Sequence, residues 1–265
     1  MSKNYGLTLG WWWARWYMHI GVIKYIQEND ISITETSGTS MWALIAAMYA
    51  TGLSSQEMID IFSEISYGKF FDGSVDLGVF GGKKVTKRLE DIFGDKKLED
   101  CAIPCSIIAA HLHTGKQKIF IKGSIVDAVR ASMSLPWVIS PYEIDGNLYI
   151  DGGVVNNLPV DVLENKHIIA SSCADTIYDT LEEHKEIRGI EIPDFTVNKV
   201  GRILNNSIQI MLKTIEDLII EHSKKELILL RPDLEKYSVF DMKKMDEIVQ
   251  LWYDETEKQS KHLLT

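Results

Sequence analysis

A serine and its neighbours occupy a position from which a hydrolase can attack an ester. Ser40 stands in the run GTSMW that begins at Gly38, between a strand-like segment and a helix-like one. In that context a nucleophile elbow points its serine out of the sheet at the N-terminus of a helix. Trp42 departs from the elbow pattern, because it stands where a second glycine would let strand and helix approach closely. A serine or threonine that merely caps the helix explains the same residues without catalysis.

An aspartate is the second candidate for chemistry. Asp151 follows the strand-like run LYI and is followed by Gly152 and Gly153. Asp-Gly-Gly is also an ordinary turn, because aspartate tolerates turn geometry and glycine reaches positive φ at no steric cost. A serine nucleophile needs a base within hydrogen-bond reach, and a carboxylate at a strand end can serve. The spacing alone leaves open whether Ser40 and Asp151 meet.

A third segment joins the first expected strand to the first expected helix. It consists of Gly10, Trp11, Trp12, Trp13, Ala14, Arg15 and Trp16. In a strand-loop-helix unit, the backbone amides of such a loop can be presented to an anion. Four tryptophans in this place are chemically unusual.

The elements that must position these residues alternate along the chain. We expect strands at 5–9, 31–36, 105–112, 117–121, 148–150 and 167–171, separated in most cases by helices, including 16–27, 41–50, 54–65 and 83–93. Ser54 and Glu57 have the spacing of a capping box at the start of the third helix. The alternation predicts an α/β fold with a largely parallel sheet covered by helices on both faces. Residues 67–82 are expected to form a glycine-rich surface loop, and helices at 197–222 and 241–258 make the C-terminal part mainly helical.

Composition excludes several classes of function. The chain has 265 residues, with 28 basic and 38 acidic side chains and a net charge of −10, so we expect no nucleic-acid partner. It shows neither the pattern of a signal peptide nor an apolar run long enough to cross a bilayer, so we expect a cytoplasmic or peripheral membrane protein. Its three cysteines lack the spaced partners of a zinc site, and we expect no metal and no cofactor. The sequence indicates no oligomeric state.

Taken together, these segments resemble the patatin-like phospholipase family. The resemblance rests on Gly10 with Ala14-Arg15 and His19-Ile20-Gly21-Val22, on Gly38 to Met41, and on Asp151 to Val160, and it covers residues 5–175. It implies a three-layer, single domain over 1–265, with a motif-bearing α/β part at 5–175 and a mainly helical part at 176–265. It also implies that Ser40 is the nucleophile and Asp151 the base of a dyad without histidine.

The resemblance further implies an activity and an oxyanion hole. The family hydrolyses lipid and other carboxylic esters, as phospholipase A, lysophospholipase or carboxylesterase, through an acyl-enzyme. Residues 10–15 correspond to its oxyanion-hole loop. The family has glycine or a very small residue at the positions of Trp11, Trp12, Trp13, Trp16 and Trp42. It commonly has one at the position of Trp137 as well. Because removing one oxyanion-hole donor costs about 100-fold to 1000-fold in rate, we expect catalysis in this chain to be abolished or strongly impaired.

Two other interpretations remain. The same fold can serve as a non-catalytic module that binds lipid or protein, with the tryptophans exposed at a membrane surface or filling the former cleft. Alternatively, His167 or His184 follows Ser40 and Asp151 in the chain order of an α/β-hydrolase triad. His167 begins an apolar strand-like run and His184 lies in an acidic stretch, which favours structural or solvated roles for both. Peripheral membrane contact stays open.

Overall fold

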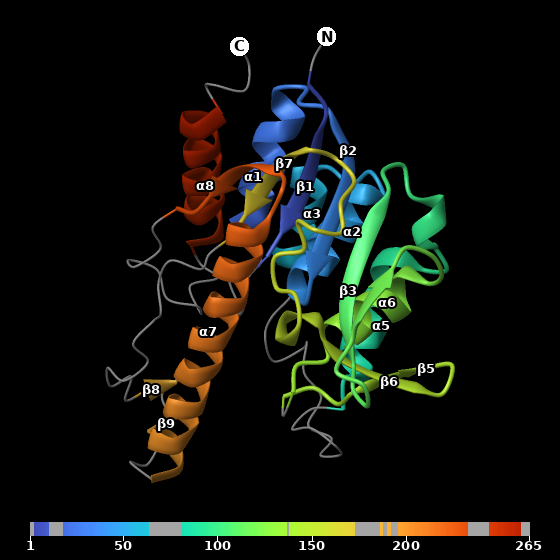
Figure 1. Cartoon of the computed structure of the whole chain (residues 1–265), viewed down its shortest axis with the longest axis vertical. Helices are drawn as coiled ribbons and strands as arrows, with labels where there is room; N and C mark the ends of the chain where they lie inside the picture. Colours follow the sequence, from blue (N-terminus) through green and yellow to red (C-terminus); the bar gives the residue numbers. More distant parts are fainter. Residues whose placement is uncertain are drawn as a thin grey trace.

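The protein forms a mixed sheet enclosed by helices (Figure 1). The computed structural model describes residues 3–10, 18–63, 81–136, 138–172, 186–187, 190–191, 196–232 and 244–260. The helices in this part are α1 (Met18–Glu28), α2 (Met41–Ala50), α3 (Ser55–Ser63), α5 (Lys83–Phe93), α6 (Ile125–Ser132), α7 (Thr196–His222) and α8 (Met245–Ser260), with short 3-10 turns η1 (Leu98–Asp100) and η2 (Gly152–Val154).

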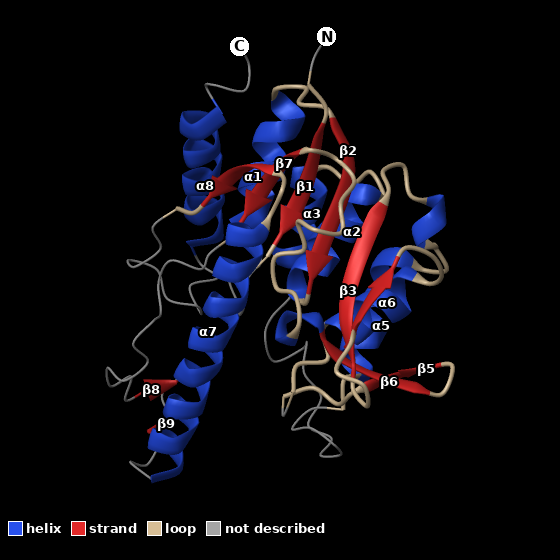
Figure 2. Cartoon of the chain, viewed as in Figure 1, coloured by secondary structure: helices blue, strands red, loops and turns tan. Residues whose placement is uncertain are grey.

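Eight strands of the described part form the main sheet. Strands are red in Figure 2. They are β1 (Tyr5–Leu9), β2 (Ile33–Thr39), β3 (Cys105–His111), β4 (Gln117–Phe120), β5 (Tyr142–Ile144), β6 (Asn147–Asp151), β7 (His167–Ser171) and β10 (Glu226–Leu230). Their order is β10-β7-β1-β2-β3-β6-β5, with β4 also paired to β3. The first five strands of that order are parallel, while β4, β5 and β6 pair in antiparallel fashion. A separate pair is formed by β8 (Glu186–Ile187) and β9 (Ile190–Glu191). The expected largely parallel α/β sheet is confirmed.

Alternating side chains divide the core between the two faces of the sheet. In β7, Ile169 joins the main core with α1, α2 and α8, while Ile168 and Ala170 pack on the opposite face with Leu158. Ile219 of α7 packs against that second cluster, so α7 and the segment after Asp151 cover the face away from α1 and α2 (Figure 1). These three layers place the carboxyl ends of β1, β2, β7 and β10 at one edge of the sheet.

Local sequence explains how α2 ends and α3 begins. The capping box at α3 is confirmed, because Ser54 N–H donates to Glu57 Oε2 at 2.8 Å and Glu57 N–H donates to Ser54 Oγ at 3.2 Å. In α2 every residue after Met41 is buried, so the helix is apolar all round, as expected for a helix inside the core. Gly52 follows with φ 89°, a conformation that stops the helix and favours glycine. No helix in the described ranges is both long and apolar enough to span a membrane.

Candidate active site

Ser40 occupies the sharp turn between β2 and α2. Its φ of 61° and ψ of −134° lie in a region that residues other than glycine rarely adopt. Gly38 makes this turn possible, because a Cβ there would lie 2.5 Å from the Trp42 carbonyl oxygen. The half-buried Ser40 is therefore held in the strained strand-turn-helix geometry that exposes a hydroxyl at the carboxyl edge of a sheet.

The hydroxyl of Ser40 does not cap α2. It makes no hydrogen bond to the first turn of the helix and donates instead to Asp151 Oδ2, at an Oγ to Oδ2 distance of 2.5 Å. Thr39, the other candidate cap, donates its hydroxyl to the carbonyl of Asn156 at 2.8 Å. The interpretation of this run as an ordinary helix cap is wrong, because both hydroxyls bond to residues around Asp151.

The pairing of β3 explains why Ser40 and Asp151 meet. Thr39, the last residue of β2, pairs with Ile108, and Asp151, the last residue of β6, pairs with Ala109. Because β4 occupies the other edge of β3 at both positions, β2 and β6 share one edge and their carboxyl ends abut. At this junction a Cβ on Gly152 would lie 2.3 Å from the Ile108 carbonyl oxygen, so only glycine fits there without a shift. Consecutive positions of one strand thus bring together residues 111 apart in the chain.

Asp151 is fully buried behind the more accessible serine. Its Oδ1 accepts a hydrogen bond from Gly153 N–H at 2.8 Å, and its own N–H donates to the Ser134 carbonyl at 2.9 Å. Burial raises the pKa of Asp151 to about 6, although the hydrogen bonds from Ser40 and Gly153 act in the opposite direction. A carboxylate with this pKa is ionised at neutral pH and still basic enough to take a proton.

Ser132 is a site residue that the sequence did not reveal. Its hydroxyl, at the end of α6, accepts a hydrogen bond from Ser40 N–H at 2.7 Å and donates to the Ile108 carbonyl at 2.5 Å. None of the segments that carry the family resemblance includes Ser132. A single serine near a helix end has many ordinary explanations, so no pattern distinguishes this one.

Gly10, the described end of the predicted oxyanion loop, lies against the segment that follows Asp151. Gly10 N–H donates to the Ser171 carbonyl at 3.0 Å, and a Cβ on Gly10 would lie 2.3 Å from the carbonyl oxygen of Asn157, in the segment after Asp151. Gly10 is therefore at a close crossing of β1 and that segment. The other predicted residues of this loop, Trp11, Trp12, Trp13, Arg15 and Trp16, lie outside the described residues, as does Trp137.

The side chain of Trp42 is buried in the core beneath the turn that holds Ser40. It is 1% exposed, and its ring packs edge to face on His19 with the ring centres 4.3 Å apart. His19 also packs on Trp252 of α8 and is hydrogen-bonded through Nδ1 to Ser171 Oγ at 2.6 Å. Burial lowers the pKa of His19 to about 3, so this histidine is neutral and serves to join α1 to β7.

The structure does not bring His167 to Ser40. His167 is the first residue of β7, and its Nδ1 lies 2.9 Å from Glu226 Oε2 at the amino edge of the parallel strands. Ser40 follows the opposite, carboxyl end of β2, so the histidine-dependent alternative is wrong for His167. His184 lies outside the described residues. Within the described ranges no cluster of three metal-ligating side chains occurs.

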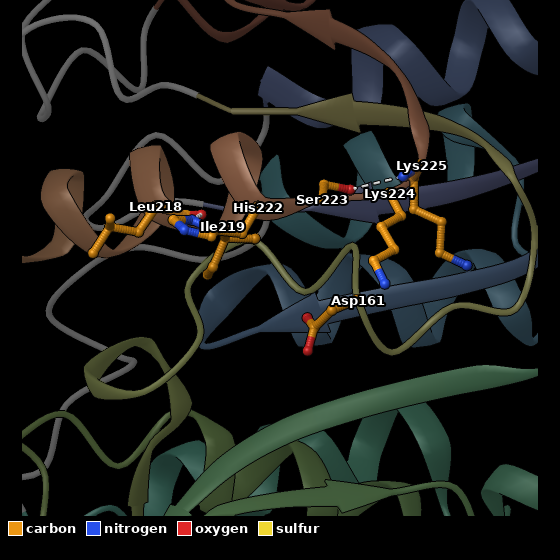
Figure 3. Close-up of a pocket in the computed structure, with 7 residues that line it drawn as sticks. All are labelled: Asp161, Leu218, Ile219, His222, Ser223, Lys224 and Lys225. Carbon is orange, nitrogen blue, oxygen red and sulfur yellow. Dashed lines mark hydrogen bonds between the residues drawn. The ribbon is translucent and has the colours of Figure 1, made fainter.

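A groove of about 630 Å³ is lined by neither Ser40 nor Asp151. Figure 3 shows the residues that line it. It is lined by Asp161, Leu218, Ile219, His222, Ser223, Lys224 and Lys225, where α7 ends and the chain approaches β10. The ammonium of Lys225 donates to the Leu163 carbonyl at 2.8 Å, which ties this groove to the segment before β7. Because β10 begins here, the groove lies toward the amino edge of the strands, and none of its lining residues belongs to the predicted site.

Curated relatives match more than half of the chain. An uncharacterized NTE family protein of Mycobacterium tuberculosis is 33% identical over 162 residues, covering 60% of this chain and 45% of the relative. Neuropathy target esterase sws of Drosophila melanogaster is 36% identical over 181 residues, covering 64% of this chain and 13% of that protein. A patatin-like phospholipase domain-containing protein of Caenorhabditis elegans is 28% identical over 271 residues, covering 93% of this chain and 20% of that protein. The chain thus spans less than half the length of these relatives.

A solved structure and a family model both match this chain. The crystal structure of VipD from Legionella pneumophila superposes with a TM-score of 0.55 at 12% identity, covering 97% of this chain and 66% of that one, which supports the patatin-like α/β architecture. The model of the family described as patatin-like phospholipase matches residues 14–164, more than half of the chain and the range that contains both Ser40 and Asp151. On these grounds the chain belongs to the patatin-like phospholipase family.

Proposed function

We propose that this chain is a serine-aspartate acyl hydrolase for lipid or other carboxylic esters, whose rate is held low by the tryptophans of its 10–16 loop. The observation that carries the proposal is the 2.5 Å hydrogen bond from Ser40 Oγ to the buried carboxylate of Asp151. Nucleophile and base within hydrogen-bond reach are the requirement for nucleophilic catalysis, and the strained elbow supports the same role for Ser40.

The proposed reaction proceeds through an acyl-enzyme. Ser40 Oγ attacks the ester carbonyl carbon while its proton passes to Asp151. The bond to the leaving alcohol then breaks, that alcohol takes the proton from Asp151, and the acyl group remains as an ester on Ser40. Water next attacks this ester and gives a proton to Asp151, which returns it to Ser40 as the carboxylic acid leaves. Asp151 acts as base and then as acid in each half of the cycle.

Negative charge on the carbonyl oxygen needs hydrogen-bond donors. Met41, directly after Ser40, begins α2, and the first amides of a helix have no acceptor within the helix and lie at its positive end. By resemblance to the family, the 10–15 loop would supply the remaining donors. We propose that tryptophan in place of glycine at positions 11, 12 and 13 removes that contribution, which at about 100-fold to 1000-fold per donor lost would leave little activity.

Trp42 enters this proposal in a different way from the loop tryptophans. Because its ring is buried on His19 and α2 is entirely within the core, replacing it with glycine would create a cavity and weaken the helix. A large-to-small change of this kind costs about 3–5 kcal/mol for a tryptophan. A variant that restores glycine should therefore keep Trp42.

The test is covalent labelling of Ser40 by a fluorophosphonate, which forms a serine phosphonate ester as fluoride leaves. We compare the unaltered chain, Ser40→Ala, and a variant with glycine at positions 11, 12, 13 and 16, after circular dichroism shows that each is folded. The glycine variant is expected to label at least about 100-fold faster than the unaltered chain. Ser40→Ala is expected not to label.

Each outcome of this labelling has a meaning. Equal rates for the unaltered chain and the glycine variant show a working hydrolase and overturn the claim that the tryptophans slow it. Absence of labelling in both rejects the dyad as catalytic and leaves the binding module as the function of this scaffold. Ester hydrolysis by the labelling-competent form then distinguishes phospholipid, lysophospholipid and simple ester substrates.

Peripheral membrane contact stays a prediction. Large apolar side chains are exposed along the outer side of α7, at Ile203, Ile210, Met211 and Leu218. Their spacing along α7 places them on one face of the helix, which supports contact with an apolar surface.

A further inference from the structure

Ser40 is the residue at which its chain segment leaves the sheet. The parallel pairing of β2 with β3 ends at Thr39 and Ile108, so the next amide, Ser40 N–H, has no strand partner. The Ser132 hydroxyl accepts a hydrogen bond from this Ser40 N–H at 2.7 Å and donates one to the Ile108 carbonyl at 2.5 Å. A single side-chain hydroxyl is thus inserted into the ladder between the two strands, and it satisfies both backbone groups at the point where they separate.

This bridge acts on the most strained residue of the site. A non-glycine residue with φ 61° and ψ −134° persists only when its surroundings hold it there. The Ser132 side chain is fully buried on α6, so water cannot replace its hydroxyl as a partner for the Ser40 amide. The alternative for Ser40 is to relax out of the turn, which would move its Oγ away from Asp151.

The same short segment also holds the other member of the dyad. Two residues after Ser132, the Ser134 carbonyl accepts the hydrogen bond of Asp151 N–H at 2.9 Å. The Ser134 hydroxyl accepts in turn from the buried guanidinium of Arg130 at 2.7 Å, which fixes the turn after α6. The end of α6 is therefore bonded to the backbone of both Ser40 and Asp151, and it sets their separation.

We propose that Ser132 is a positioning residue for the nucleophile: its hydroxyl holds the Ser40 backbone in the elbow, and thereby Ser40 Oγ within reach of Asp151. The effect of Ser132 on catalysis rests on the proposed function. The hydrogen bond between Ser132 and the Ser40 amide does not depend on that function.

The first test measures that hydrogen bond directly, in the unaltered protein and in Ser132→Ala. Exchange of the Ser40 amide hydrogen, followed by nuclear magnetic resonance, is expected to be at least about tenfold faster in Ser132→Ala because the buried acceptor is gone. The matched control is Ser37→Ala, which also removes a buried serine hydroxyl, one that bonds to Thr8 Oγ1 and the Pro159 carbonyl at 2.9 Å each. Ser37→Ala should leave Ser40 exchange unchanged.

The second test is the rate of fluorophosphonate labelling against probe concentration. Ser132→Ala is expected to lower the maximum rate by about 100-fold, as a displacement of about 1 Å does, with little change in the concentration for half-maximal rate. Ser132→Thr, which keeps the hydroxyl, should restore most of the rate. If its added methyl prevents folding, Ser132→Cys serves instead, and its weaker hydrogen bond should give an intermediate rate.

Three results would overturn the proposal. They are unchanged Ser40 exchange in Ser132→Ala, an equal loss of labelling in Ser37→Ala, or no recovery of rate in a folded Ser132→Thr or Ser132→Cys variant. If the unaltered chain and its loop-glycine variant both fail to label, the proposed function fails, and the exchange experiment alone decides the role of Ser132.

Discussion

At the scale of single residues, one feature of Asp151 governs both reactivity and stability. The carboxyl is fully buried, and burial raises its pKa to about 6. The charged form that would accept the Ser40 proton is therefore also the form that burial disfavours. Two predictions follow from this conflict, one for rate and one for stability.

The labelling rate of Ser40 should depend on pH through Asp151. The ionised carboxylate takes the proton, so the rate should be constant above about pH 7 and fall about tenfold per pH unit below about pH 6. Asp151→Asn should lower the plateau by at least about 100-fold and abolish this dependence. A pH-rate profile measured between pH 5 and 8 checks both, and a midpoint near pH 4 would contradict the assigned environment of Asp151.

Stability should change in the opposite sense. The folded pKa of about 6 exceeds the ordinary value of 3.8, so the folded state binds the proton more tightly than the unfolded state. The stabilisation that comes from the protonated form is complete below about pH 4 and is lost as the pH rises through about 6. Asp151→Asn, which stays neutral, should be about 1–3 kcal/mol more stable than the unaltered chain at pH 8 and equally stable at pH 3.5. Urea unfolding at the two values measures this, and an equal gain at both would show that charge is not the cause.

At the scale of elements, the sequence predicted helices and strands whose end residues form a recognisable pattern, such as a capping box. The third helix was predicted from Ser54 and Glu57, and the structure contains the reciprocal bonds between them. Strand β10 was missed, because its short apolar run follows a long helix and periodicity does not distinguish a buried strand from more helix. Strand β5 was missed because three residues are too few to show alternation.

The crossing of α1 and α8 gives a prediction for an element pair. Gly21 permits their close approach, since a Cβ there would lie 2.2 Å from the Val249 carbonyl oxygen and 2.8 Å from Trp252 Cβ. Gly21→Ala should force the helices apart at a cost of about 1–3 kcal/mol. At about 2–4 °C per kcal/mol for a chain of this size, the melting temperature should fall by several degrees.

Trp252 gives that variant an internal reporter. It is fully buried in α8, so a shift of α8 should move its fluorescence emission to longer wavelength; because the chain has seven tryptophans, the Trp252 contribution is taken as the difference from the same chain with Trp252→Phe. An unchanged melting temperature together with unchanged emission would mean that α8 does not pack on Gly21 as described.

At the scale of the whole molecule, the candidate site could be predicted only as separate pieces. Ser40 and Asp151 were visible as a strand-to-helix serine and a strand-end aspartate, and the family resemblance joined them. The bridge through Ser132 could not be predicted, because it depends on where β2 and β6 stop along β3, and strand ends are fixed by packing rather than by local residues. Likewise Trp42 was expected to disturb the elbow, whereas its ring lies in the core on His19.

The abutting ends of β2 and β6 have a consequence for how the protein folds. The contact between Ser40 and Asp151 joins residues 111 apart in the chain, and it requires two separate pairings, of β2 with β3 and of β6 with β3. A chain that has formed its helices and its parallel strands but not this antiparallel pair holds a serine without a base. During refolding, helical circular dichroism should therefore recover before the capacity for labelling. Reactivity of Ser40 would therefore report that both pairings are in place, and a newly made or damaged chain has no complete Ser40–Asp151 pair until β2 and β6 are both on β3.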